Sequence, residues 1–147
     1  RSILADPSRP DMKDRVNNQV KHREPWRPFA PSVLEEAIGR YTAKPMVSPY
    51  MILAFDTNPG SQVEIVSATH VDGTCRPQTV SRATNPRYWQ LIKRFEELTG
   101  IPAVLNTSFN VDSQPIVNTP EEAIDTFLNC DMDVLAIGDF LVWKREQ

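Results

Sequence analysis

Three cationic side chains in the segment 21–31 have the chemistry to bind an anion. Lys21, Arg23 and Arg27 lie within seven residues, and prolines at 25, 28 and 31 restrict the backbone around them. A guanidinium group can bind phosphate through two parallel hydrogen bonds, and an ammonium group supplies a point charge. If this segment is extended, alternation places all three cations on one side. The segment therefore predicts an anion site; the alternative is a solvated loop that Trp26 and Phe29 anchor.

Two further polar groups of residues follow predicted strands. Arg76 and Gln78 come after the turn signal Asp72-Gly73, and Asn106-Thr-Ser-Phe-Asn110 continues an apolar run. Loops after strands commonly carry binding groups. Because buried polar groups without partners cost stability, these side chains either bond the local turn backbone or contact a polar ligand.

The composition indicates how a phosphate would be held. The 147 residues include 13 Pro and only 5 Gly, and neither GxxxxGK[ST] nor GxGxxG occurs. Side chains would therefore have to bind any phosphate. Residues 1–27 hold seven Lys/Arg against four acidic residues, whereas the whole chain has a net charge of -3. The sequence pI of about 5.4 disfavours general nucleic-acid binding, so we expect no nucleic-acid partner.

Cysteine, histidine and apolar patterns exclude other classes of protein. Two cysteines cannot form a disulfide framework, which predicts a reduced, cytoplasmic setting. Two histidines without paired spacing give no support for a zinc site, and no apolar run reaches the ~18 residues of a membrane span. The first residue is Arg1, in the middle of a pattern, which predicts a piece of a longer protein.

Periodicity and capping residues predict the elements that must position these side chains. Asn85 and Thr119 are expected to cap two helices that begin with proline, and Ser32 is expected to cap a shorter one. The helix stripe Trp89, Ile92, Phe95 and Leu98 is expected in the core. Residues 62–70 are expected to pair with 50–57 as a hairpin, and 134–143 to form one long buried strand. The expected elements are helices at 32–41, 86–99 and 119–129 and strands at 50–57, 62–70, 102–109 and 134–143. Helices that alternate with strands predict a single α/β domain over 1–147. Within it, residues 1–31 are expected to be a loop-rich cationic segment, and residues 32–147 are expected to form the α/β body with a mixed sheet.

With these motifs in order, the chain resembles the C-terminal domain of the carbamoyltransferase family that includes nodulation and antibiotic O-carbamoyltransferases. Cys75 stands where the family is expected to have a small residue and is given no role. The resemblance is carried by Arg1-Ser-Ile-Leu-Ala5, Asn18, Lys21-His-Arg-Glu24, Arg27-Pro-Phe-Ala-Pro31, Asp72-Gly-Thr-Cys-Arg76, Gln78-Thr-Val80, Gly100-Ile-Pro102, Asn106-Thr-Ser-Phe-Asn110, Pro115-Ile-Val117 and the stretch from Asp133 to Lys144.

The resemblance implies a YrdC-like fold, a twisted mixed sheet with flanking helices. It implies a domain that makes carbamoyl adenylate from carbamoyl phosphate and ATP, with Mg²⁺ accompanying ATP. A Kae1-like N-terminal domain of the same chain would hold iron and transfer the carbamoyl group to a hydroxyl. The fragment alone would have only partial activity, and its oligomeric state stays open.

The resemblance also assigns roles to residues of this chain. It implies catalytic roles for Lys21, Arg27, Arg76 and Ser108, with Arg23, Asn106 and Asn110 as further substrate-binding residues. Arg1 also matches, and Asp72 is a candidate Mg²⁺ ligand that is more readily a turn residue; no metal site is predicted in this chain. Two alternatives remain: a non-catalytic module that binds an anion or nucleotide, and a YrdC-like domain related to RNA modification, which the acidic balance disfavours.

Overall fold

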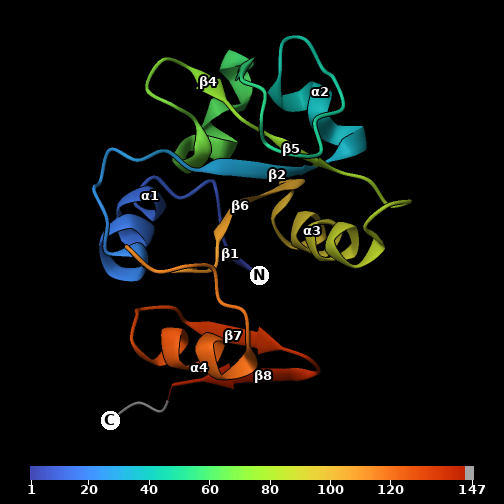
Figure 1. Ribbon diagram of the computed structural model, residues 1–147. Helices are drawn as coiled ribbons and strands as arrows, with labels where there is room; N and C mark the ends of the chain where they lie inside the picture. Colours follow the sequence, from blue (N-terminus) through green and yellow to red (C-terminus); the bar gives the residue numbers. More distant parts are fainter. Residues whose placement is uncertain (145–147) are drawn as a thin grey trace. The chain divides into compact units, whose positions relative to one another are not determined.

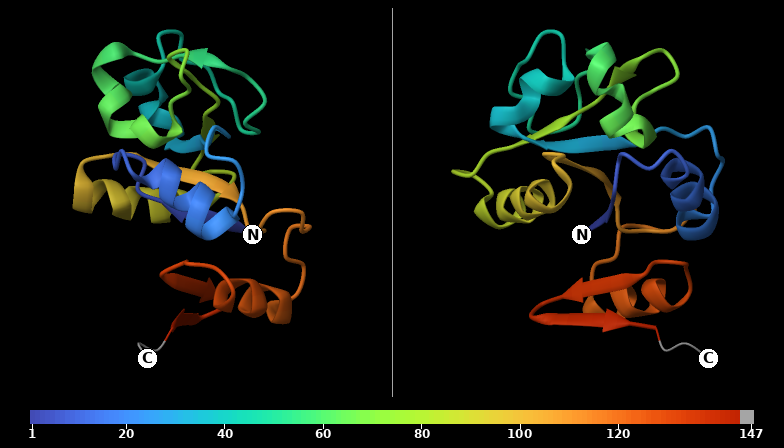
Figure 2. Two further views of the ribbon diagram at one scale, coloured as in Figure 1. Left: turned by 90° about the vertical axis from the view of Figure 1, so that its left-hand side faces the viewer. Right: turned by 180° about the vertical axis from the view of Figure 1, so that it is seen from behind.

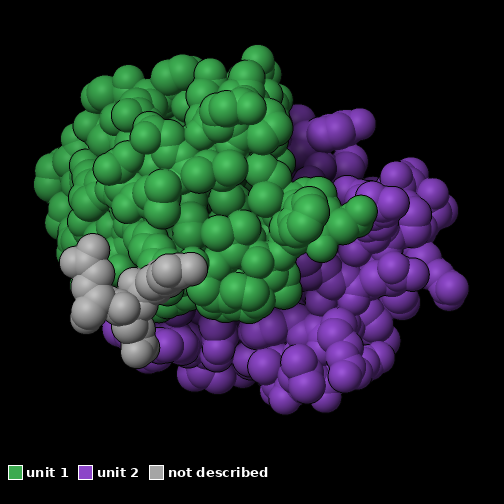
Figure 3. Space-filling view, turned by 90° about the horizontal axis from the view of Figure 1, so that it is seen from below, with its two compact units in different colours: residues 1–3, 14–27, 108–147 green, residues 4–13, 28–107 purple. Residues whose placement is uncertain are grey.

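The structure, a computed structural model, describes residues 1–144 and divides into two units (Figure 3). Unit 1 comprises residues 1–3, 14–27 and 108–147, of which 145–147 are not described, and unit 2 comprises residues 4–13 and 28–107.

Most of a mixed sheet belongs to unit 2, although residues 2, 3 and 108 of its strands are counted in unit 1. Its order is β1-β6-β2-β5, with β2 parallel to β5 and antiparallel to β6. The prediction of an α/β fold with a mixed sheet and flanking helices is confirmed. The strands are β1 (Ser2–Ala5), β2 (Ala30–Leu34), β5 (Gln78–Val80) and β6 (Ala103–Ser108).

Each face of this sheet carries its own apolar cluster. Val33 and Ala103 pack with Tyr41 and Ile65 on the face covered by α2 (Ile38–Tyr41) and the 3₁₀ segment η3 (Pro59–Ala68). Successive residues of a strand point to opposite faces. The other face therefore holds Leu34, Val80 and Val104, and it packs against Ile92 of α3 (Pro86–Thr99). Figure 1 shows α3 on one side of β2 and β5, with α2 and η3 on the other.

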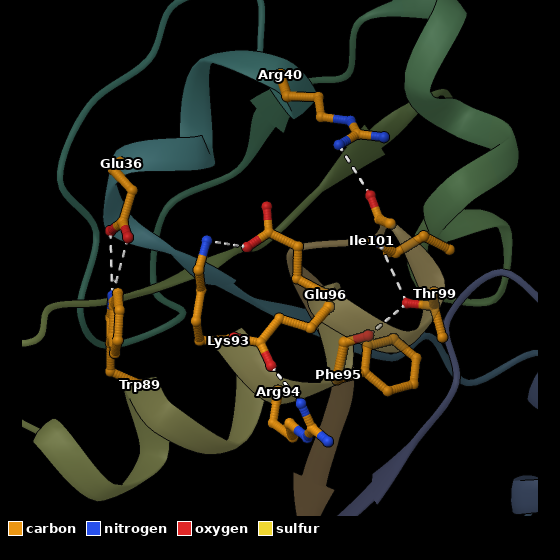
Figure 4. A network of polar contacts seen from close by, with 11 residues as sticks. Glu36, Arg40, Trp89, Lys93, Arg94, Phe95, Glu96, Thr99 and Ile101 are labelled. Carbon is orange, nitrogen blue, oxygen red and sulfur yellow. Dashed lines mark hydrogen bonds and ion pairs between the residues drawn. The ribbon is translucent and has the colours of Figure 1, made fainter.

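Helix α3 begins and ends where its capping residues predict. The Asn85 side chain accepts a hydrogen bond from the Tyr88 amide, and Gly100 ends the helix at φ 79°. Figure 4 shows the Trp89 indole donating to Glu36 of the neighbouring 3₁₀ turn and an ion pair between Lys93 and Glu96. The predicted stripe is only partly core, because Ile92 is fully buried whereas Leu98 is 72% exposed.

Unit 1 contains a helix and a hairpin at the C-terminal side of the chain. Helix α4 (Pro120–Leu128) starts with the predicted capping box, in which Thr119 and Glu122 satisfy each other's backbone N–H groups. It lies along the β-hairpin formed by β7 (Val134–Ile137) and β8 (Phe140–Trp143) (Figures 1 and 2). Phe127 and Leu135 are buried in this part of the unit.

The prediction of one long buried strand over 134–143 was wrong. Gly138 adopts φ 57° and allows a tight turn, so the run folds back as β7 and β8. Phe140, Leu141 and Trp143 are exposed. The apolar composition hid a glycine turn in the middle of the run.

The prediction of a hairpin from 50–57 and 62–70 was also wrong. Only β3 (Phe55–Asp56) is a strand in the first segment, and it pairs with β4 (Thr74–Cys75). The second segment is η3, in which Ile65 is buried and Val63 is 71% exposed. Alternation of apolar residues over a short run did not distinguish a strand from a 3₁₀ helix.

Two predictions in the first 41 residues need correction. Ser32 does not cap a helix but lies in β2, so the helical stretch is shorter: η2 (Glu35–Ala37) followed by α2. The segment 1–31 is not a loop throughout, since it contains β1, α1 (Met12–Arg15) and η1 (Val16–Lys21).

Candidate functional site

Lys21 is placed by a π-helix in unit 1. Segment η1 forms the wide π turn and ends at His22, whose φ of 51° is left-handed. Such turns are rare and often occur at functional sites. The result is that Lys21, despite its charge, is only 2% exposed.

The ammonium group of Lys21 contacts the last residue of β6 and a second residue two positions beyond it. Its Nζ donates to the Ser108 carbonyl at 2.8 Å, to Ser108 Oγ at 3.3 Å and to Asn110 Oδ1 at 2.6 Å. Ser108 Oγ also donates to Asn110 Oδ1 at 2.6 Å, and Asn110 donates to the Gln114 carbonyl. An ammonium has three N–H groups, so all of them are directed at neutral acceptors. We call Lys21, Arg23, Arg27, Ser108 and Asn110 the cationic cluster.

Asn17 organises the loop that carries the two arginines of this cluster. Its buried side chain donates to the carbonyls of Pro25 and Arg27 at 3.3 and 3.1 Å, and its Oδ1 accepts from Arg23 Nε at 2.7 Å. The loop therefore closes around one amide group. Arg27 itself is exposed and faces Glu24 at 3.6 Å.

The cationic cluster carries an excess of positive charge. Burial, together with the nearby charges of Arg23 and Arg27, lowers the pKa of Lys21 to about 8. Burial is also the main reason why the pKa of Arg23 lies below its ordinary value, with Arg27 adding to the effect. Within residues 1–144, no carboxylate bonds to Lys21 Nζ. A bound anion would favour the charged ammonium by supplying the missing opposite charge.

The predicted alignment of the three cations along an extended segment was wrong. Lys21 ends a helical turn and is buried, whereas Arg27 lies in a loop and is exposed. The alternative loop anchor is not Trp26, which is 73% exposed, although Phe29 is buried. The structure nevertheless brings Lys21 close enough to both arginines for their charges to interact.

A second polar group lies in unit 2, on the face of the sheet that α3 covers. Asn106 Nδ2 donates to Ser32 Oγ at 2.9 Å and to Gln78 Oε1 at 3.2 Å. Ser32 Oγ donates to the same Gln78 oxygen at 2.8 Å, and Gln78 Nε2 donates to the Pro49 carbonyl at 3.2 Å. We call Pro49, Gln78, Ser32 and Asn106 the amide relay.

Tyr88 stands beside this relay. Its hydroxyl is buried and has no hydrogen-bond partner within the described part of the chain. Burial raises the pKa of Tyr88 to about 12, and the side chains of Ser32 and Asn106 reduce that shift. The hydroxyl is therefore a neutral polar group.

Arg76 and Asp72 lie in another part of unit 2. Arg76 is exposed between β4 and β5, and its charge helps burial to keep the pKa of His70 below its usual value. The Asp72 carboxylate accepts from the Thr74 amide and hydroxyl, which is the turn role expected for it. No group of three or more His, Cys, Asp and Glu suited to a metal ion occurs in the described stretch.

The predicted site residues thus belong to separate local settings. Ser108, Asn110 and the three cations of segment 21–27 belong to unit 1, whereas Arg76 and Asn106 belong to unit 2. Arg1 donates to the Val117 carbonyl and to Asn118. The sequence does not predict Asn17, Ser32, Gln78 or Tyr88 as site residues. For Gln78, its position two residues after Arg76 is a sequence signal that could have indicated a role.

Cys75 and Cys130 are free thiols, and both are buried. Burial raises the pKa of the Cys75 thiol to about 11. In residues 1–144, no helix has the length and apolar character needed to cross a bilayer.

Comparisons with known proteins agree with the resemblance drawn from the sequence. Residues 1–144 match the family model described as "Carbamoyltransferase C-terminus". Nodulation protein NolO of Bradyrhizobium diazoefficiens is 48% identical over 99% of this chain and 27% of its own length. Nodulation protein NolNO of Sinorhizobium fredii is 46% identical over 99% of this chain and 22% of its own length. Nodulation protein U of Rhizobium tropici is 40% identical over 76% of this chain and 19% of its own length. The chain therefore spans about a quarter of these relatives or less.

Proposed function

Because the chain belongs to the carbamoyltransferase C-terminus family, we propose that it forms carbamoyl adenylate from carbamoyl phosphate and ATP. Both substrates are anions, and bringing them together requires positive charge held in place. The observation that carries the proposal is the cationic cluster, in which a buried lysine lies near two arginines and no carboxylate within residues 1–144 bonds to its ammonium group. Transfers at phosphorus depend mainly on positioning and electrostatics, so no protein nucleophile is needed.

The proposed reaction balances with one water molecule. Carbamoyl phosphate and water give carbamate and inorganic phosphate. A carbamate oxygen then attacks the α-phosphorus of ATP and forms the new O–P bond. The bond between that phosphorus and the bridging oxygen breaks, and pyrophosphate leaves with the electron pair.

The residues of unit 1 have distinct roles in this proposal. Arg27 is exposed and can grip phosphate oxygens with its planar fork. Lys21 supplies the fixed positive charge, which Ser108 and Asn110 orient. Arg23, tied to Asn17, adds to the same field.

The residues of unit 2 contribute separately. Arg76 is an exposed cation that can bind phosphate, and Asn106 offers a neutral polar contact for the carbamoyl group. Mg²⁺ would enter with ATP as part of the substrate.

The partners of this step are also proposed. A Kae1-like N-terminal domain of the same chain, holding iron, would receive the adenylate and carbamoylate a hydroxyl in the cytoplasm. The relatives support a division of this kind because they are several times longer than this chain. Their printed names, which concern nodulation, leave the acceptor of this protein open.

The test is pyrophosphate release by the full-length protein supplied with MgATP and carbamoyl phosphate. The change Lys21→Met keeps the volume of the side chain and removes its charge. We expect the rate to fall roughly 100-fold, because a fixed charge at a reacting phosphate contributes on that scale. Lys44→Met, at an exposed lysine, is the matched control and is expected to react like the wild type.

Two results would contradict the proposal. One is an unchanged rate in a folded Lys21→Met protein. The other is a wild-type protein that binds carbamoyl phosphate in a calorimeter but releases no pyrophosphate, which would favour the non-catalytic anion-binding module.

A further inference from the structure

The amide relay of unit 2 has a fixed hydrogen-bond direction from one end to the other. The fixed point is the Pro49 carbonyl, because a backbone carbonyl can only accept. The Gln78 amide must therefore present its Nε2 to Pro49, as it does at 3.2 Å, and point its Oε1 toward Ser32 and Asn106. This assignment leaves no freedom to flip Gln78.

The direction of Gln78 determines that of Asn106. Two amide oxygens cannot bond to each other, so Asn106 must present Nδ2 to Gln78 Oε1. The second N–H of this group goes to Ser32 Oγ at 2.9 Å, since the Ser32 proton already points at Gln78. Both donors of Asn106 are thus occupied.

The side-chain oxygen of Asn106, Oδ1, is the atom of this amide that is left to contact a ligand. Asn106 is half-buried, and no described residue bonds to its Oδ1. A carbonyl oxygen attracts an N–H or O–H group and repels the oxygens of a phosphate dianion. Asn106 is therefore unsuited to contact phosphate and suited to contact an amide N–H.

We propose that Gln78 and Ser32 are positioning residues that hold the Asn106 carbonyl oxygen toward the amide N–H of a carbamoyl group. This inference rests on the proposed function for the identity of the ligand. It adds a basis for specificity: the relay selects a substrate with an N–H group over one of the same shape without it.

The positions of the relay residues on the sheet support this proposal. Residues 32 and 34, 78 and 80, and 104 and 106 share one face, and Leu34, Val80 and Val104 of that set pack under α3. The same face thus changes from apolar to polar along its length. Three polar side chains in this row cost stability unless each is bonded, which the relay achieves while sparing one acceptor.

The test compares carbamoyl phosphate with acetyl phosphate, in which a methyl group replaces the amide nitrogen. The dissociation constants of both, and of inorganic phosphate, are measured by calorimetry on the full-length protein. We expect the wild type to prefer carbamoyl phosphate by roughly tenfold, which corresponds to one hydrogen bond.

Gln78→Leu removes the anchor of the relay and lets the Asn106 amide turn. We expect the preference to fall to about twofold or less while the affinity for inorganic phosphate stays unchanged, which a general structural defect would not produce. Gln90→Leu, the same change at an exposed position of α3, is the control and should keep the wild-type preference. If Gln78 acts through Asn106, then Gln78→Leu combined with Asn106→Ala will lose no more preference than Asn106→Ala alone.

The outcomes separate this inference from the proposed function. Equal binding of carbamoyl and acetyl phosphate by the wild type would overturn the inference alone, and so would a full preference in folded Gln78→Leu. Failure of the wild type to bind carbamoyl phosphate would overturn the proposed function, and this inference with it. Should Gln78→Leu not fold, Ser32→Ala, which removes one of the two acceptors for Asn106, must show a smaller loss of preference; an unchanged preference would overturn the inference.

Discussion

The cationic cluster of unit 1 and the amide relay of unit 2 use opposite means to leave a group for a ligand. The cluster concentrates positive charge and directs the Lys21 donors at neutral oxygens. The relay is uncharged, occupies both donors of Asn106 and spares an acceptor. The cluster therefore suits an anion, and the relay suits an N–H group.

The two regions also differ in what they cost the fold. A buried ammonium without a carboxylate partner is expensive, because its charge loses hydration. A neutral relay in which donors and acceptors match carries little such penalty.

The largest effect is expected at Asn17, on which the arginine loop of the cluster depends. Asn17→Leu would leave the Pro25 and Arg27 carbonyls and the Arg23 side chain without their shared partner. We expect the free energy of unfolding to fall by about 2–4 kcal/mol in denaturant titrations, and phosphate affinity to fall with it. Asn18→Leu, at the exposed neighbouring position, should change the free energy of unfolding by less than about 0.5 kcal/mol. Similar losses of stability in both variants would contradict the claim that the Asn17 side chain organises the arginine loop.

The cost of the buried charge predicts a specific pH dependence. The pKa of Lys21 is about 8 in the folded chain against 10.5 as the ordinary value, so the unfolded chain binds more protons between these pH values. Stability due to this group therefore rises as the pH goes from 8 to 10.5. We expect the wild type to gain about 1–3 kcal/mol relative to Lys21→Met over that window, measured by unfolding at pH 7.5 and 10.5. Parallel pH curves for the two proteins would mean that burial does not perturb Lys21.

Arg76 tests whether unit 2 contributes charge as well as the relay. Arg76→Ala should slow pyrophosphate release roughly tenfold, because one phosphate contact of a cation is lost. The free energy of unfolding should stay the same, since the side chain is exposed. Arg87→Ala, at an exposed arginine of α3, is the control. A wild-type rate in Arg76→Ala would show that Arg76 does not contribute positive charge to the reaction.

The smallest effect is expected at Tyr88, next to the relay. Its buried hydroxyl has no hydrogen-bond partner among the described residues, so Tyr88→Phe removes an unsatisfied group. We expect thermal unfolding to show a stability unchanged or raised by up to about 1 kcal/mol, with the preference for carbamoyl over acetyl phosphate retained. A loss of stability would show that the hydroxyl has a partner in solution and that the relay extends to it.

Elements with local signals could be predicted from the sequence. Helices α3 and α4 are capped by Asn85 and Thr119 as expected, because a capping residue followed by proline acts within a few residues. The pairing of β2 with β5 and β6 joins residues 46 and 74 positions apart, as the Ser32 contacts show. No local pattern contains such information, and Ser32 was consequently assigned to a helix.

The candidate site was predicted unevenly for the same reason. Lys21, Ser108 and Asn110 were on the predicted list, and the structure brings them into contact. The burial of Lys21 depends on a π turn, which has no recognised sequence signal. Gln78 lies two residues from the predicted site residue Arg76, but its orientation depends on a hydrogen bond to the Pro49 carbonyl. A backbone carbonyl is present in every residue, so the sequence gives no sign of this contact.

Because of the π turn of η1, the position of Lys21 depends more on the number of residues in this short segment than on which residues they are. Deleting one residue between Val16 and Val20 would restore an ordinary helical turn and rotate Lys21 by about 100° around the axis. The ammonium group would then leave its oxygens while every residue of the cationic cluster was still present. Across descendants of this gene, a substitution at an exposed position such as Gln19 should therefore be tolerated, whereas insertions and deletions in this segment should be eliminated by selection.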